Sequence, residues 1–390
     1  MGARLIGWMV VLGSVLVSGS AQSQRLTTAE LIWPPAPEQP RIRYLGSWNS
    51  TADLGIKQSF LSRLGRSVTG RRGELSLVIQ RPFDVHATSD GRLYVTDALN
   101  PYIAVFDPTR KESVRLGSGL SNGLVRPAGL GSDREGNLYV ADPTRKTVFV
   151  FDAAGAVLRT IGGPHLLRNP QDVAVDDVAD RVYVVDSHLH QVLVFDRSGV
   201  ERGRIGKTES DTLAADSPEA KVHEPSDDPA AGQHGGGGAT LGRRDLVANR
   251  GSGPGEFNFP FAVAVGPDGR VYVTDQMNFR VQVFDRAGEF IRAIGKAGTG
   301  PGNFSRPKGI AVSAANHIYV VDAAFNNVQV FAPDGQLLMF FGAMGPGEGQ
   351  FWLPLGIDVS PTGAIYVADR YNHRVQVFQY LPESGRQPEQ

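Results

Sequence analysis

Six aspartates are the most regular candidates for chemistry in this chain of 390 residues. Each ends an apolar-Tyr-Val-x-Asp segment, and consecutive copies lie 45, 44, 89, 47 and 47 residues apart. Six carboxylates around a shared channel could bind a cation, because Ca²⁺ and Mg²⁺ prefer oxygen ligands. We favour a structural role, since a turn aspartate accepts hydrogen bonds from nearby backbone N–H groups. The six residues are Asp97, Asp142, Asp186, Asp275, Asp322 and Asp369.

Histidine is the other candidate for metal chemistry. The segment from Asp186 to Val192 carries His188 and His190, and His190 is the one candidate metal ligand that we retain. A single imidazole does not make a catalytic zinc site, because three protein ligands are the usual number. The chain has no cysteine, which excludes Cys-based metal sites, cysteine nucleophiles and c-type haem attachment. We therefore expect no catalytic residue and no cofactor.

The aspartates recur because the chain repeats a unit of about 45 residues, a period typical of propeller arrays. In the best copy, four short runs rich in Val, Ile, Tyr and Phe lie within 260–295, separated by turn residues. Such runs predict four antiparallel strands, which together form one blade. We expect an all-β, six-bladed propeller spanning residues 82–378. Its blades are expected at about 82–126, 127–169, 170–206, 260–306, 307–353 and 354–378.

The sixth unit has no good fourth strand, because only residues 379–390 follow it. A strand-like run at 41–48 precedes the first unit, and we expect it to complete the sixth blade and close the ring. The insertion at 207–250 is acidic and then Gly-rich, a composition that cannot bury a core. The remaining expected segments are a Pro-rich linker at 24–40, the closing strand and lead-in at 41–81, this disordered insertion, and a disordered tail at 379–390.

The N-terminus has the pattern of a secretory signal peptide. Arg4 precedes an apolar run of 13 residues from Leu5 to Val17, and small residues follow as far as Ala21. We expect residues 1–23 to be the signal segment, with cleavage after Ala21 or Ser23; an uncleaved membrane anchor is the alternative. The expected mature protein is exported, periplasmic or secreted, and not inserted in a membrane.

Two segments of the last unit resemble the NHL repeat closely. They are Pro354-Leu355-Gly356-Ile357-Asp358-Val359 and Asp369-Arg370-Tyr371-Asn372-His373-Arg374-Val375-Gln376-Val377-Phe378. The resemblance implies a six-bladed propeller but leaves function open, because the family includes RNA-binding propellers, sensor domains of kinases and a metal-dependent amidating lyase. Those lyases hold zinc with histidines from different blades. His190 matches one such position, whereas the companion positions carry Phe261, Lys308 and Leu355.

One face of the predicted ring is the expected binding surface. The turns after the repeat aspartates and the crossovers between blades lie on the same rim, and concave propeller faces commonly bind ligands. A structural role is the alternative, since Asn tolerates turn geometry and Arg pairs with carboxylates. The candidate partner-binding residues are Arg81, Arg126, Arg145, His188, His190, Asn278, Arg280, Arg306, Asn372 and Arg374.

The charge balance bears on the choice of partner. With 39 basic and 40 acidic residues, the chain lacks the overall basic footprint of a nucleic-acid-binding protein. We expect a monomeric binding or scaffolding module for a protein, peptide or glycan partner in the cell envelope. A metal-dependent propeller enzyme of the lyase or lactone hydrolase type is the first alternative. Nucleic-acid binding through a basic rim is the second.

Overall fold

The computed structural model describes residues 31–35, 38–39, 41–53, 77–118, 123–206 and 250–381. The expected signal segment at 1–23, most of the linker at 24–40, the lead-in at 54–76, the insertion at 207–249 and the tail from 382 lie outside the described residues. Within the described ranges, no helix has the length and apolar character needed to cross a bilayer.

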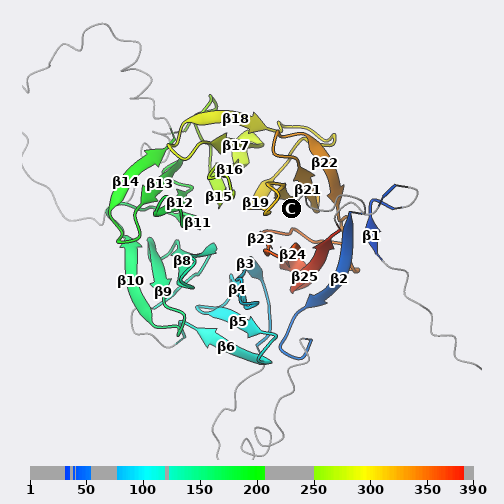
Figure 1. Cartoon of the computed structure of the whole chain (residues 1–390), viewed down its shortest axis with the longest axis horizontal. Coiled ribbons are helices and arrows are strands. Elements are labelled where there is room, and N and C mark those ends of the chain that lie inside the picture. The colour runs from blue at the N-terminus through cyan, green and yellow to red at the C-terminus, as the bar shows by residue number, and fades with distance from the viewer. Residues whose placement is uncertain are drawn as a thin grey trace, which may run out of the picture. The chain divides into compact units, whose positions relative to one another are not determined.

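Six antiparallel sheets stand around a common axis as the blades of a ring (Figure 1). The predicted all-β, six-bladed propeller of four-stranded blades is confirmed. Blade 1 consists of β3 (Pro82–Ala87), β4 (Leu93–Asp97), β5 (Ile103–Asp107) and β6 (Glu112–Leu116). Blade 2 consists of β7 (Leu130–Ser132), β8 (Leu138–Asp142), β9 (Thr147–Phe151) and β10 (Val157–Gly162). Blade 3 consists of β11 (Pro170–Asp176), β12 (Arg181–Asp186), β13 (Gln191–Phe195) and β14 (Glu201–Ile205).

The second half of the ring repeats this order. Blade 4 consists of β15 (Pro260–Val265), β16 (Val271–Asp275), β17 (Arg280–Phe284) and β18 (Phe290–Ile294). Blade 5 consists of β19 (Pro307–Val312), β20 (Ile318–Asp322), β21 (Asn327–Phe331) and β22 (Leu337–Phe341). Blade 6 consists of β23 (Ile357–Val359), β24 (Ala364–Asp369), β25 (Arg374–Tyr380), β2 (Ile42–Trp48) and β1 (Ile32–Trp33). Two 3₁₀ turns, η1 (Gln276–Asn278) and η2 (Arg370–Asn372), follow β16 and β24.

The core lies between the blades. Six clusters of buried apolar side chains each join two neighbouring blades, so every blade is packed on both faces. This explains why the second strands β4, β8, β16 and β20 are buried along their whole length. The repeat tyrosines Tyr139, Tyr183, Tyr272 and Tyr319 are among the largest fully buried side chains. Their packing role therefore follows from burial.

The N-terminal strand β2 lies beside the last strand β25, as Figure 1 shows. The pairing runs from Ile42 opposite Tyr380 to Trp48 opposite Val375. Because Tyr380 has this partner, β25 continues two residues past Phe378, where the sequence pattern ends. The indole of Trp33 on β1 lies 5.9 Å from the ring of Phe378. How much this pairing stabilises the ring is a prediction taken up below.

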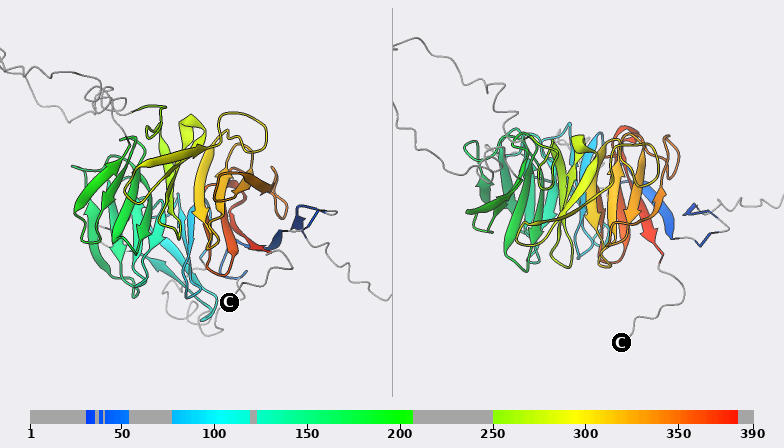
Figure 2. Two further views of the ribbon diagram at one scale, coloured as in Figure 1. Left: turned by 45° about the horizontal axis from the view of Figure 1, so that its top comes forward. Right: turned by 90° about the horizontal axis from the view of Figure 1, so that it is seen from above.

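Turns lie at both faces of the ring, which Figure 2 shows edge-on in its right panel. We call the face with the turns after the repeat aspartates and the blade-to-blade crossovers the crossover face. The opposite face carries the hairpins between the first and second and between the third and fourth strands, and we call it the hairpin face.

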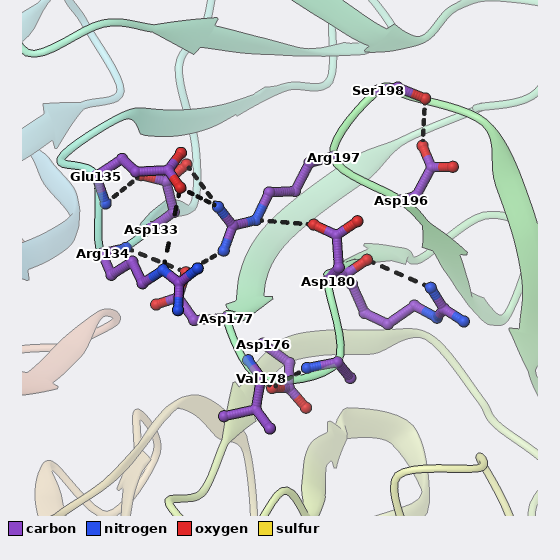
Figure 3. Close-up of polar contacts among 12 residues, drawn as sticks. Asp133, Arg134, Glu135, Asp176, Asp177, Val178, Asp180, Asp196, Arg197 and Ser198 are labelled. Carbon is purple, nitrogen blue, oxygen red and sulfur yellow. Dashed lines mark hydrogen bonds and ion pairs between the residues drawn. The ribbon is translucent and has the colours of Figure 1, made fainter.

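A single arginine joins blades 2 and 3 on the hairpin face (Figure 3). Arg197 Nη1 lies 3.0 Å from Glu135 Oε1 and 3.9 Å from Asp133 Oδ2. Its Nη2 lies 2.5 Å from Asp177 Oδ1, and its Nε lies 3.1 Å from Asp180 Oδ1. The Asp133 side chain is fully buried, so its charge depends on this partner and on local hydrogen bonds.

Replacing Arg197 with Met should destabilise the protein by about 2 kcal/mol, because a buried carboxylate then loses its cation. Urea unfolding measures this loss. Arg134→Met is the matched control, since that side chain is 71% exposed and reaches Glu135 only at 4.0 Å. The control should cost less than about 0.5 kcal/mol. Equal costs for the two variants would contradict a clamp between the blades.

Candidate functional site

The repeat aspartates hold the crossovers in place. Asp97 Oδ2 accepts hydrogen bonds from the backbone N–H groups of Gln80 and Arg81 at 2.7 and 2.8 Å, and its Oδ1 accepts one from Leu99 at 2.9 Å. The other five make equivalent bonds in their own blades, and all six are buried. Their carboxylates point into the backbone of the turns, so the structural interpretation is confirmed.

Arg280 and Arg374 are tied to these aspartates rather than presented to solvent. Arg280 Nε lies 2.9 Å from Asp275 Oδ2, and its Nη2 donates to the carbonyls of Gly253 and Glu256, both at 2.8 Å. Arg374 is bound to Asp369 in the same way. Asn278 and Asn372 donate to the same two carboxylates and to crossover carbonyls. These contacts support the structural alternative for all four residues and leave them little capacity for a partner.

His190 also has a structural role. It precedes β13 with a left-handed backbone (φ 56°), and its Nδ1 accepts a hydrogen bond from the Phe259 N–H at 2.9 Å. Asn326 occupies the equivalent position in blade 5, and its Oδ1 accepts from the Leu353 N–H at 2.8 Å. The same backbone position thus links each of these blades to the next. His188 remains half-buried, with its ring edge-on to Phe259.

The remaining candidates lie on the crossover face and differ in how far their side chains are exposed or already bonded. Arg126 and Arg306 are exposed, and Arg145 donates from Nε to the Gly123 carbonyl at 2.9 Å. Arg81 lies with its guanidinium 5.6 Å from the centre of the Tyr371 ring. Among the described residues, no three His, Asp or Glu side chains are grouped as metal ligands.

The second residues of the inner strands form the mouth of the central channel on the crossover face. Phe83 on β3 and Phe261 on β15 come from opposite blades, yet their ring centres lie only 5.7 Å apart. They meet near the axis and form the floor of the mouth. Lys308 on β19 extends over this floor, with Nζ 3.8 Å from the Phe261 ring centre and 2.6 Å from Gln276 Oε1.

The mouth is strongly cationic. Burial, together with the charges of Arg306 and Arg370, lowers the pKa of Lys308 to about 7. Arg370 begins η2, and its guanidinium lies 5.6 Å from the centre of the Tyr371 ring. The indole of Trp352 lies 5.9 Å from the same ring. The arrangement offers positive charge beside flat aromatic surfaces, which suits an anionic ligand that carries an apolar or ring group.

Beneath the aromatic floor lies a cavity of about 170 Å³ lined by the inner strands of all six blades. Asp84, Asp172, Asp358 and His86 face it. His86 Nδ1 lies 3.0 Å from Asp358 Oδ2, and its Nε2 lies 2.8 Å from Ser132 Oγ. All three aspartates also hold the next blade. Asp84 and Asp172 accept hydrogen bonds at 2.9 Å from the backbone N–H groups of Leu130 and Val263, and Asp358 accepts one at 2.8 Å from Ala87.

Burial disfavours the charged forms of two carboxylates of the cavity, Asp84 and Asp172. Burial raises the pKa of Asp84 to about 7, against hydrogen bonds from Leu130 and Val85. Burial and the charge of Asp84 likewise raise the pKa of Asp172. For His86, burial acts to lower the pKa, but attraction to Asp358 outweighs it and the net direction is upward.

The free energy of unfolding of Asp84→Asn, compared with that of wild type at the same pH, should increase as pH rises. The raised pKa means that the folded state keeps a proton that the unfolded state releases above pH 4, so wild-type stability falls as pH rises towards 7. Asn cannot ionise and still accepts the Leu130 N–H. Between pH 5 and 8 the variant should gain on the order of 1–3 kcal/mol over wild type in urea unfolding. A difference that is constant with pH would refute the assignment.

The sequence predicts the crossover face as the binding surface, but it does not predict the mouth at the centre of that face. Phe261, Lys308 and Leu355 stand at positions where the lyases carry histidine, and of the three only Lys308 is also predicted on the crossover face. The signal that could have found the mouth is the set of residues directly after each repeat proline: Phe83, Ala128, Gln171, Phe261, Lys308 and Leu355. The sequence does not predict the ion pairs of Arg197 on the hairpin face, because their carboxylates belong to blade 2 or to another hairpin of blade 3.

Several solved structures share the fold. An auxiliary nutrient binding protein from Bacteroides thetaiotaomicron is 12% identical with a TM-score of 0.54, covering 78% of this chain and 70% of that one. A gluconolactonase from Xanthomonas campestris is 13% identical with a TM-score of 0.52, covering 81% and 93%. A virginiamycin B lyase from Staphylococcus aureus is 11% identical with a TM-score of 0.50, covering 80% and 86%. At these identities the likeness concerns the fold alone.

Family models agree with the repeats seen in the structure. No curated protein matches the chain. A model described as an NHL repeat matches residues 167–195 and 351–378, which lie in blades 3 and 6. A model described as a 6-bladed beta-propeller matches residues 263–335, which lie in blades 4 and 5. Together with the six sheets of the ring, these matches identify the chain as a six-bladed β-propeller that contains NHL repeats.

Proposed function

We propose that this propeller is an exported binding or scaffolding module that captures a protein, peptide or glycan partner of the cell envelope on its crossover face. The observation that carries the proposal is the cationic, aromatic mouth around Lys308 and Phe261. Large apolar side chains are exposed around it on the same face. They are Leu99, Val125, Met277, Met344 and Trp352.

Two features support binding rather than catalysis. The polar groups of the crossover face that would resemble a catalytic set, the repeat aspartates and His190, are used to hold the backbone. The exposed side chains of this face include large apolar and cationic groups, which are typical of a recognition surface. Nothing about the mouth requires a chemical step.

Partner capture from an envelope extract tests this function. Immobilised wild-type protein should retain a partner that the double variant Met277→Ser, Met344→Ser retains at least about tenfold less, a loss of some 1.4 kcal/mol. Val178→Ser is the control, because Val178 is 78% exposed on the hairpin face. If the double variant and wild type retain the same partner equally, the crossover face is not the binding surface.

The proposed export has its own test. We propose that residues 1–23 direct the chain across a membrane, from the Arg4 and Leu5–Val17 pattern. Mass spectrometry of the protein recovered from the native envelope should then give an N-terminus just after Ala21 or Ser23. An intact N-terminus in a membrane fraction would favour the anchor, and an intact N-terminus in the cytoplasm would exclude export.

A further inference from the structure

We propose that the mouth of the channel binds an oxyanion, a carboxylate or a phosphate, carried by the partner and held by Arg306, Lys308 and Arg370. This inference rests on the proposed function and names the chemistry of its binding site. We call these three residues the oxyanion site. It is distinct from the repeat aspartates and from the cavity beneath the aromatic floor.

The first observation is a concentration of positive charge without a counter-ion. Lys308 Nζ contacts the neutral Gln276 and the face of Phe261, and within the described residues no carboxylate forms an ion pair with it. Arg306 and Arg370 lie close enough for their charges to act on it. Two positive charges near a poorly solvated ammonium group are unfavourable until an anion joins them.

The second observation is an unused donor. Arg370 Nε is buried, and no hydrogen-bond acceptor for it exists among the described residues. Buried donors are nearly always satisfied in folded proteins, so one that is not calls for a ligand or a water. A guanidinium that presents Nε and one terminal N–H side by side matches the geometry of a carboxylate or phosphate.

Two neighbouring arginines of the crossover face show the contrast with the mouth. Arg280 and Arg374 are paired with the fully buried carboxylates of Asp275 and Asp369, at 2.9 Å in each case. Asp369 Oδ1 accepts a hydrogen bond from the Trp352 N–H, and its Oδ2 accepts from Arg374, Asn372 and Gln376, so this carboxylate is already engaged. The fold thus neutralises these two guanidiniums, whereas among the described residues no carboxylate forms an ion pair with Arg306, Lys308 or Arg370.

The walls of the site indicate what the oxyanion is attached to. Two guanidiniums, those of Arg81 and Arg370, each lie 5.6 Å from the centre of the Tyr371 ring. Trp352 packs beside Tyr371, and Phe261 and Phe83 form the floor. A planar or apolar group next to the oxyanion would lie against these rings. The expected ligand class is therefore a carboxylate or phosphate attached directly to a ring.

Binding of an oxyanion should be linked to proton uptake. In the free protein, burial lowers the pKa of Lys308 to about 7, so near pH 8 much of it is neutral. An anion at the site favours the charged form and raises this pKa. Affinity should then fall as pH rises from 7 to 9, and binding at pH 8 should take up protons. A binding site of permanently charged arginines alone would show neither effect.

Isothermal titration with three small probes tests the site on the full protein. Benzoate and phenyl phosphate carry the two oxyanions on a ring, and benzamide is the neutral counterpart of benzoate. We expect at least one oxyanion probe to bind about tenfold or more tightly than benzamide, and the heat in buffers of different ionisation enthalpy to show proton uptake at pH 8. Whichever of benzoate and phenyl phosphate binds more tightly identifies whether the partner supplies a carboxylate or a phosphate. Equal binding of benzamide and both anions would overturn the proposal.

Two substitutions locate the binding. Lys308→Met should weaken the anionic probe about tenfold or more and abolish the proton uptake, whereas Arg370→Gln should weaken it but leave the uptake in place. Lys296→Met is the matched control, since Lys296 is exposed outside the mouth, and it should change neither. Lys308→Met removes a poorly solvated charge, so the variant should fold at least as well as wild type. Unchanged probe binding in folded Lys308→Met would refute the site.

The capture assay separates this inference from the proposed function. If Lys308→Met loses the probes but still captures the partner, the oxyanion site exists and the partner uses the surrounding face. If neither anion binds wild type while capture still depends on Met277 and Met344, the oxyanion site is refuted and the binding module stands.

Discussion

Deleting residues 25–48 is expected to lower the melting temperature by more than about 10 °C or to prevent soluble expression. The deletion removes β2, whose Ile42 is fully buried in the cluster between blades 5 and 6, together with Trp33 of β1. Removing a buried aliphatic or aromatic side chain costs about 2–5 kcal/mol, and here several are removed at once. It also exposes the backbone edge of β25.

Scanning calorimetry measures the melting temperature. If the truncated chain does not fold, a point variant tests the same contact. Ile42→Ala should cost about 2–4 kcal/mol by itself, because Ile42 has no exposed surface and packs in a cluster that includes Phe341 and Phe378. Deletion of residues 25–30 alone serves as the control, since it ends before β1. Melting temperatures that stay unchanged after the full deletion would mean that the N-terminal strand does not seal the ring.

The second large effect is expected at Arg280. Arg280→Ala should lower the free energy of unfolding by about 3–5 kcal/mol. The fully buried Asp275 would lose its cation, and the carbonyls of Gly253 and Glu256 would lose their hydrogen-bond donor. Arg126→Ala is the control, since Arg126 is exposed and binds Asp142 only through its backbone N–H; it should cost less than about 0.5 kcal/mol. Urea unfolding distinguishes them. A small cost at Arg280 would return this arginine to the list of candidate partner-binding residues.

The fold could be predicted from the sequence because each blade is a local unit. The strands of blade 4 can be predicted from apolar residues such as Tyr272, Val281 and Phe284, which all lie within one repeat unit. Comparing the repeats then shows which residues face the neighbouring blade. The same locality predicted that residues 41–48 form a strand. It did not reveal β1, a two-residue strand whose position depends on Trp33 packing against Phe341 and Phe378.

The candidate site was harder to predict, because it depends on contacts between blades. Phe83 and Phe261 meet near the axis although 178 positions separate them, and no local pattern reports that distance. Sequence also does not show whether an arginine is already paired. Arg280 and Arg370 both follow a repeat aspartate closely. Arg280, which begins β17, reaches the buried carboxylate of Asp275, whereas the Nε of Arg370, directly after Asp369, has no acceptor among the described residues.

The pairing of β2 with β25 has a consequence for biosynthesis. The strand β2 is synthesised before all six repeat units, whereas its partner β25, Arg374–Tyr380, belongs to the last of them. Blades 1 to 5 can assemble during translation, but the ring stays open until β25 has been synthesised. A truncated or stalled chain would therefore leave an open edge for proteases and chaperones to recognise, so completeness is checked by the architecture itself.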